Sequence, residues 1–172
     1  MPQEDVLHLA RWTVTSGSNA TSRGAVVIDA GEHHWQASAQ GNGAVDALFR
    51  AVDAALAEVL NGHPRLVGYD VHAVAEGPDS EGLVSLRIRP PAGAEGPRAT
   101  GEYVGESRGT NIIAASIEAY IEALNALLDE PHWSDAAEVA GRGRRPVTAG
   151  DGRRAEYDRT RASHDATSWF EP

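Results

Sequence analysis

Two glycine-containing corners, each just ahead of a helical pattern, are the residues whose type and spacing suggest chemistry. The first is Gly41-Asn42-Gly43 and the second is Gly109-Thr110-Asn111. A helix N-terminus presents unpaired backbone N–H groups and a partial positive charge, which together suit a carboxylate. Glycine lacks the Cβ atom that would keep such a ligand away from the backbone. The two corners therefore predict a pair of binding sites for a small carboxylate.

A second set of polar side chains suggests acid–base chemistry, because an imidazole beside a carboxylate can move a proton near neutral pH. Asp70 and His72 lie two residues apart on a predicted strand and share one face. The adjacent His33 and His34 point to opposite faces, so we do not expect them to hold a metal together. The candidate residues for an enzyme are His33, His34, Asp70, His72, Glu102 and Tyr103. Exposed ion pairs on a solvated strand are the alternative explanation for them.

The composition excludes several classes of chemistry and partner. The 172 residues include no Cys, which excludes disulfides, thiolate catalysis and cysteine-bound zinc. All 15 basic residues are arginines, which excludes lysine chemistry. A net charge of −10 argues against nucleic acid and anionic membranes as partners. No apolar run approaches membrane-spanning length and the N-terminus shows no signal-peptide pattern, so we expect a cytoplasmic protein without a cofactor or metal.

The elements that must position these residues follow one order twice. The predicted strands are 6–17, 24–30, 33–39, 65–77, 82–90 and 98–105. The first three precede an apolar helical stripe that starts at Ala44 and ends at Asn61-Gly62, a C-terminal stop signal. The last three precede a stripe that ends at Leu128, with Thr110 or Asn111 as the expected N-cap. This repeated β-β-β-α order predicts an α/β (α+β) fold of two duplicated halves with helices packed on sheets.

Within the fourth predicted strand, apolar and polar residues alternate. Val67, Tyr69 and Val71 share one face, and Asp70 and His72 share the other. The pattern predicts that the apolar face lies in the core and that the polar face is solvated or functional.

The chain divides into a predicted body at residues 1–128 and a predicted tail at residues 129–172. The tail is rich in Arg, Gly and mixed charges, so we expect it to be flexible. Trp169 and Phe170 near its end are costly to leave in water, which makes them candidates for anchoring it to the body or to a partner.

Three segments of the body carry a family resemblance. They are GNGAVDALFRAVDAAL from residue 41, YDVHAVAEGPDSEGLVSLRIR from residue 69 and GTNIIAASIEAYIEALNALL from residue 109. In residue type and spacing they resemble the C-terminal regulatory domain of 2-isopropylmalate synthases and the related citramalate synthases. The similarity extends from about residue 7 to residue 128.

The resemblance implies a domain of two pseudo-symmetric halves that dimerises and binds an end-product amino acid, leucine or isoleucine, at the two corners. Ala44, Val45, Ile112 and Ile113 would then line a pocket for the branched side chain, and Asp46 or another carboxylate would meet the ammonium group. The implied ligand site comprises Gly41, Asn42, Gly43, Ala44, Val45, Asp46, Gly109, Thr110, Asn111, Ile112 and Ile113.

This sequence departs from the family pattern at the corners. Ala44 stands where the family usually has Pro, Asn111 where it usually has Asp, and Ala114 where an acidic residue is common. An ammonium group prefers a carboxylate to an amide, so the departures predict a changed ligand or a lost one. The metal-dependent (β/α) barrel of the synthases and its His-x-His metal site have no counterpart in this sequence.

Three hypotheses follow. In the first, the chain is a free-standing regulatory or dimerisation domain of leucine biosynthesis that binds a branched-chain amino acid or related small carboxylate and docks on a separately encoded synthase. In the second, it is an enzyme of specialised metabolism that uses the former effector pocket. In the third, it is a structural dimer without a small ligand.

Overall fold

The computed structural model describes residues 6–18, 20–74, 76–77, 80–133 and 136. The elements are β1 (His8–Gly17), β2 (Ala20–Ala30), β3 (His33–Gly41), α1 (Ala44–Ala55), α2 (Ala57–Leu60), β4 (Arg65–Ala73), β5 (Gly82–Arg89), η2 (Gly96–Ala99), β6 (Tyr103–Gly109), α3 (Ile112–Leu128) and η3 (Pro131–Trp133). Their order confirms the predicted duplication of a β-β-β-α unit.

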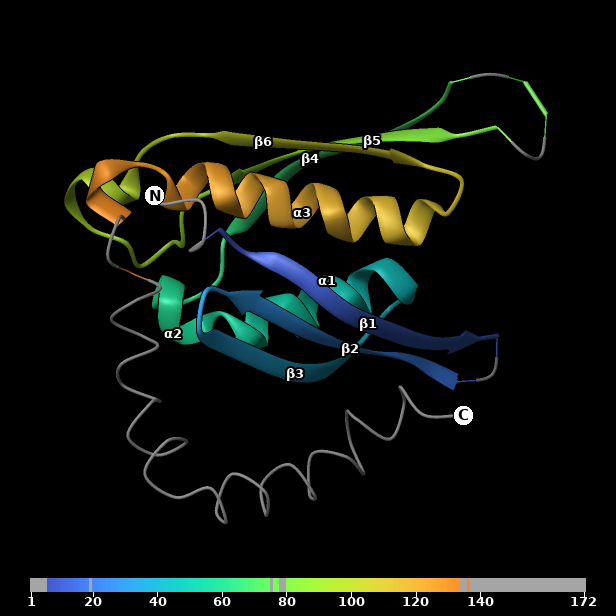
Figure 1. Cartoon of the computed structure of the whole chain (residues 1–172), viewed down its shortest axis with the longest axis horizontal. Coiled ribbons are helices and arrows are strands. Elements are labelled where there is room, and N and C mark those ends of the chain that lie inside the picture. Colours follow the sequence, from blue (N-terminus) through green and yellow to red (C-terminus); the bar gives the residue numbers. More distant parts are fainter. Residues whose placement is uncertain (1–5, 19, 75, 78–79, 134–135, 137–172) are drawn as a thin grey trace, which may run out of the picture.

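Each half is a three-stranded antiparallel sheet covered on one face by its helix. The sheet orders are β1-β2-β3 and β4-β5-β6. Helix α1 packs on β2 and β3, α3 packs on β5 and β6, and the two helices contact each other. The molecule therefore has four layers, with both helices enclosed between the two sheets (Figure 1).

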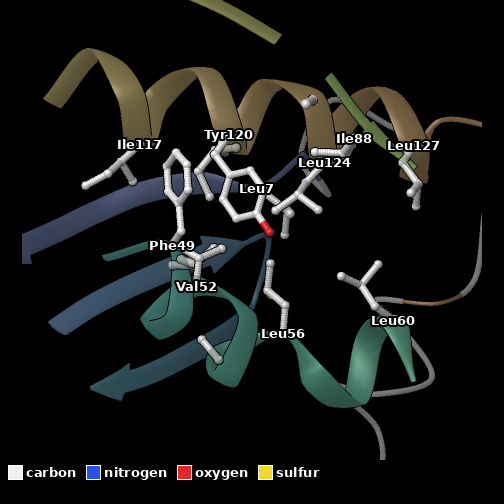
Figure 2. Packing of buried hydrophobic residues seen from close by; sticks show 14 of the residues in the cluster. Leu7, Phe49, Val52, Leu56, Leu60, Ile88, Ile117, Tyr120, Leu124 and Leu127 are labelled. Atoms are coloured by element: carbon white, nitrogen blue, oxygen red, sulfur yellow. The ribbon is translucent and has the colours of Figure 1, made fainter. Parts of the chain in front are cut away.

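The core lies where the two helices meet. Figure 2 shows the side chains of α1 and α2 pointing toward those of α3, with Leu7 from the chain ahead of β1 entering between them. The backbone N–H of Leu7 donates to Asn125 Oδ1 at 2.8 Å, and Asn125 Nδ2 donates to the Leu7 carbonyl at 3.0 Å. The fully buried side chains around this junction include Leu7, Leu48, Leu56, Leu60, Ile117, Leu124 and Leu127.

The helix boundaries follow local sequence signals. The first predicted helix is broken at Leu56 (φ −103°, ψ 11°), which separates α1 from α2. Asn61 ends α2 in the left-handed conformation (φ 52°, ψ 47°), which agrees with the predicted Asn-Gly stop. Of the two predicted caps for α3, Asn111 is the one observed.

The structure corrects the position of the sixth strand. The sequence predicts it at 98–105, whereas β6 is Tyr103–Gly109 and η2 occupies Gly96–Ala99. Pro97 has no backbone N–H to give to a ladder, and it is accommodated in the first turn of the 3₁₀ helix instead.

The structure also corrects the environment of β4. The alternation predicts core positions for Val67, Tyr69 and Val71, but their exposed fractions are 39%, 38% and 43%. The reason is that α3 covers β5 and β6 and leaves β4 at an uncovered edge of its sheet.

The packed chain continues beyond the end of α3. Trp133 is 1% exposed, and the Arg98 guanidinium lies 4.3 Å from its ring centroid. Arg98 Nε also donates to the His132 carbonyl at 2.6 Å. The rest of the predicted tail, including Trp169 and Phe170, lies outside the described residues. In the part of the chain that the structure describes, no helix is long and apolar enough to cross a membrane.

Candidate functional site

The first corner joins β3 to α1 and leaves the helix start without a side-chain cap. Gly43 is the N-cap residue, with nearly extended backbone (φ 159°, ψ 171°), and it has no side chain to accept a hydrogen bond. Asp46 Oδ2 instead accepts the backbone N–H of Asn42 and Arg50 Nε, each at 2.9 Å. The Asp46 carboxylate therefore stabilises the corner itself, and only its Oδ2 atom is used in these bonds.

The two glycines of this corner have different roles. A Cβ atom on Gly41 would lie 2.5 Å from the Ala47 backbone N and 2.6 Å from Asp46 Oδ2. Gly41 is thus required by the close approach of the β3 end to the first turn of α1. A Cβ on Gly43 would have no heavy atom within 4 Å, so Gly43 is the glycine that leaves open space at the helix start.

A polar hollow of about 460 Å³ lies beside the first corner. Its lining residues are Ser16, Gly17, Ser18, Ala20, Thr21, Ser22, Gly41, Asn42 and Gly43. Ser22 is 5% exposed, and its Oγ lies 2.7 Å from Ser16 Oγ. Hydroxyl groups and bare backbone of this kind suit an oxygen-rich ligand such as a carboxylate.

Sequence reasoning missed the hydroxyl residues of this hollow. They come from the β1–β2 hairpin, and the β2–β3 register sets Ser22 opposite Gly41. Counting residue pairs back from the turn between β2 and β3, which starts at the pair Ala30 and His33, leads to Ser22 opposite Gly41.

The second corner, between β6 and α3, is closed by its own side chain. Asn111 Oδ1 accepts the backbone N–H of Ile113 at 3.0 Å and that of Ala114 at 3.2 Å. The Asn111 amide thus serves as the N-cap of α3. Two N–H groups that a ligand's carboxylate would use are already satisfied.

The two corners lie at the same end of the molecule. Helices α1 and α3 run side by side in the same direction, so both begin at one end of the helical layer (Figures 1 and 2). Nevertheless, the hollow beside the first corner is lined by no residue of the second. The residues predicted to bind a ligand thus lie at two neighbouring helix starts. Among the described residues, neither of the two hollows along α1 is lined from both corners.

A second hollow, of about 360 Å³, lies between α1 and the chain entering β4. It is lined by Asp46, Phe49, Arg50, Asp53, His63, Pro64, Leu66 and Tyr120. The Tyr120 hydroxyl donates to Asp53 Oδ1 at 2.5 Å. Burial raises the pKa of the Asp53 carboxyl group. Burial also raises the pKa of the Tyr120 hydroxyl well above its usual range, and the charge of Asp53 raises it further.

The Asp53–Tyr120 pair is the feature of this hollow that sequence reasoning missed. Asp53 looks like a solvated position of α1, and Tyr120 is 67 residues away on α3. Only the packing of α1 against α3 brings them together, so no pattern within a short stretch of the sequence predicts the pair.

The six candidates for acid–base chemistry are divided between the two sheets, with two on β3, two on β4 and two at or just before the start of β6. His34 Nδ1 lies 2.5 Å from Asp29 Oδ1 at the β2–β3 hairpin, and the His33 ring packs against Trp35 with centroids 5.9 Å apart. Asp70 and His72 are exposed on β4, in the other sheet. Of the histidines among these candidates, His34 is the one with an Asp carboxylate within hydrogen-bond distance. Among the described residues, no interaction links Asp70 to His72.

The remaining two candidates also have structural roles. Glu102 pairs with Arg89 at 2.9 Å and with Arg87 at 3.6 Å on the surface of the second sheet. Tyr103 is 8% exposed, and burial raises its pKa. An enzymatic role for the six residues stays a prediction. Among the described residues there is no group of three or more His, Asp or Glu placed to hold a metal ion.

Fold and site together define the class of this protein. It is a small α+β domain of two β-β-β-α units that meet helix to helix, with ligand-sized hollows along α1. The chain belongs to the LeuA allosteric (dimerisation) domain family, whose model matches residues 1–128.

Its relatives are much longer proteins. A 2-isopropylmalate synthase from Methylobacterium nodulans is 35% identical over 126 residues, which make up 72% of this chain and 22% of that protein. A protein from Methanoculleus marisnigri, named as an (R)-citramalate synthase, is 36% identical over 128 residues, or 73% of this chain and 23% of its own. For a 2-isopropylmalate synthase from Salinibacter ruber the identity is 34% over 105 residues, or 61% and 17% of the two chains. The chain thus spans about a fifth of the length of these relatives.

Proposed function

We propose that this regulatory and dimerisation domain binds a small carboxylate, most specifically a branched-chain amino acid, at the start of α1 and passes the binding signal to a synthase. The family supplies the regulatory and self-associating character. The ligand, its site and the synthase partner are the parts that we propose.

One observation carries the proposal: α1 begins without a side-chain cap beside a polar hollow, whereas α3 is capped by Asn111. A carboxylate at the start of α1 would accept the free first-turn N–H groups and meet the positive end of the helix dipole. Gly43 leaves space for it. The first corner therefore takes the main part in binding.

The other predicted residues would contact the rest of the ligand. Ala44 and Val45 are half-buried in the first turn of α1, and Ile112 and Ile113 are half-buried in the first turn of α3. These four apolar side chains suit a branched aliphatic group held between the two helix starts. Asp46 Oδ1, which is not used in the corner's own hydrogen bonds, is the proposed acceptor for the ammonium.

The proposed partner follows from the relatives. The matched relatives are named as synthases and are several times longer than this chain. We propose that the domain acts on a synthase catalytic domain, so that an end product of leucine biosynthesis or of a related pathway controls it.

Isothermal titration calorimetry with leucine, isoleucine, valine and their 2-keto acids tests the ligand. We expect saturable binding of at least one of these compounds, weakened about tenfold or more by Gly43→Ala, because the added methyl group enters the open space at the helix start. Gly96→Ala, likewise at a positive φ and with nothing within 4 Å, is the matched control at η2. Absence of heat and of a thermal shift at millimolar ligand would refute the proposed ligand class. Equal affinity of the wild type and Gly43→Ala would refute the site.

A further inference from the structure

The side chains of β4 form an apolar surface that no described element of the protomer covers. Its residues, here called the β4 ledge, are Leu66, Tyr69 and Val71, with exposed fractions of 45%, 38% and 43%. Val67 at the bulge of β4 and Val74 just past its end are exposed to a similar extent, and among the described residues the remaining large apolar side chain of this kind is Val104 at 48%. Exposed apolar residues of this size are therefore concentrated along one strand.

The sheet register shows toward which side the ledge points. Paired residues of an antiparallel ladder face the same side, and the partners of Leu66, Tyr69 and Val71 on β5 are Ile88, Leu86 and Val84, respectively. These three partners are 0–1% exposed beneath α3. The ledge thus continues the helix-covered face of the sheet past the point where α3 stops covering it.

β4 also lacks the protection that edge strands usually carry. It is a terminal strand of its sheet, and the acidic and basic residues of its interior, Asp70 and His72, lie on the opposite face. Edge strands with an exposed apolar face and no charge on that face tend to associate. A contiguous apolar surface of this kind is expected to be buried against another protein surface.

Tyr69 gives the ledge a rigid centre. Its hydroxyl lies 2.6 Å from Ser116 Oγ on α3, and its ring packs edge-on against Phe49 of α1 at 6.1 Å and 84°. A side chain held from both helices loses little conformational entropy when a second surface docks on it. Rigid aromatic anchors of this kind commonly carry much of an interface's affinity.

We propose that the β4 ledge is the surface through which two copies of this chain associate about a two-fold axis. The occupant is a second copy, because the domain belongs to a dimerisation family. An apolar surface with no charge on its side is self-complementary, as an isologous interface requires. A polar partner surface would leave its own groups unpaired there. The inference rests on the self-association included in the proposed function and adds the surface that carries it.

Sedimentation equilibrium of the full chain provides the test, with Val71→Asp as the disrupting variant and Val104→Asp as the matched control. Val104 is similarly exposed on the same sheet, but it lies opposite Arg87 on the other face. We expect the wild type and Val104→Asp to be dimers, and Val71→Asp to raise the dimer dissociation constant about 100-fold or more, with an unchanged circular dichroism spectrum.

The absence of cysteine gives a second measurement that does not depend on a disruptive charge. We expect the thiol of Val71→Cys to react with a maleimide more slowly as protein concentration rises through the dimer range, and that of Val104→Cys to react at a constant rate. Protection of the Val71→Cys thiol that is independent of concentration would show that another part of the chain covers the ledge, which overturns the proposal.

The outcomes separate this inference from the function on which it rests. A wild type that stays monomeric at all concentrations removes both the self-association and the ledge proposal. A dimer that persists in Val71→Asp, or that is lost in Val104→Asp, removes only the assignment of the surface. Leucine and isoleucine binding is measured by calorimetry on the same variants and reports separately on the ligand proposal.

Discussion

At the scale of single residues, the side-chain amide of Asn111 occupies the place at the start of α3 that a ligand's carboxylate would otherwise take. It accepts from Ile113 and Ala114, whereas Gly43 at the start of α1 has no side chain that could accept from the first turn. Two helix starts related by the internal duplication have therefore diverged. At the start of α3, the Asn111 side chain satisfies first-turn N–H groups. At the start of α1, no side chain does so, and the first-turn N–H groups are left for a ligand or solvent.

Replacing Asn111 tests its capping role. We expect Asn111→Ala to lower the free energy of unfolding by about 1 kcal/mol, because two backbone N–H groups lose their acceptor. We expect Asn111→Asp to keep the cap and to add about 0.3–1 kcal/mol at low salt, because its charge interacts with the helix dipole. Urea unfolding followed by circular dichroism measures both. Equal stability of all three proteins would show that Asn111 does not cap α3 in solution.

At the scale of elements, the helices approach their sheets closely because particular strand positions have no side chain. A Cβ atom on Gly105 of β6 would overlap the Ala119 carbonyl oxygen of α3 and lie 2.6 Å from the Ala123 backbone N. Both obstacles are backbone atoms, which cannot rotate away. Gly41 has the equivalent role between β3 and α1, where the nearest atom is the Ala47 backbone N at 2.5 Å.

The Gly105→Ala variant measures this close approach. We expect it to cost about 3 kcal/mol or more, or to prevent folding, because α3 must move away from β6 along its length. Gly17→Ala is the matched control in a strand, since a Cβ there meets nothing within 4 Å, and we expect a change of less than about 0.5 kcal/mol. Similar unfolding midpoints for the two variants in urea would contradict the packing described for α3 on β6.

The elements also show which parts of this fold sequence reasoning can predict. The apolar stripes of α1 and α3 and the cap and stop residues Asn111 and Asn61 are local signals, and they gave the duplicated order correctly. The exposure of Val71 depends on how far α3 extends across its sheet, and the position of Ser22 beside the first corner depends on strand register. Neither can be predicted from a short stretch of the sequence. The alternation at Tyr69, Asp70, Val71 and His72 was therefore predicted correctly, whereas the predicted burial of Tyr69 and Val71 was wrong.

At the scale of the whole molecule, the two halves are joined through the helix pair at the centre of the four layers. The Phe49 and Tyr120 rings stack with centroids 4.5 Å apart, and the Tyr120 hydroxyl donates to Asp53. Leu7 and Asn125 make a reciprocal pair of hydrogen bonds that joins the chain just ahead of β1 to α3. The polar contact at Asp53 places a titratable group at this junction, so the stability of the whole domain should depend on its protonation.

The sign of that dependence follows from the raised pKa of Asp53. Burial is the largest cause, the hydrogen bond from Tyr120 and the charges of His63 and Arg50 oppose it, and Asp46 adds to it. With a pKa higher in the folded than in the unfolded chain, Asp53 contributes stability that is present at low pH and is lost as pH rises through the folded pKa. Asparagine cannot ionise. We therefore expect Asp53→Asn to gain stability relative to the wild type as pH rises from the ordinary carboxyl range through the folded pKa of Asp53, by about 1.4 kcal/mol for each unit by which the pKa is raised.

The Tyr120→Phe variant is the matched partner of this experiment, because removal of the hydroxyl takes away a bond that holds the Asp53 pKa down. We expect its stability to fall more steeply with pH than that of the wild type, and the double variant with Asp53→Asn to lose this extra slope. Urea unfolding at a series of pH values gives all four curves, and the differences between them report on Asp53 and Tyr120. Four parallel curves would show that Asp53 does not couple protonation to the packing of the two halves. Curves that diverge in the expected order would identify the Asp53–Tyr120 hydrogen bond as the pH-sensitive link between α1 and α3.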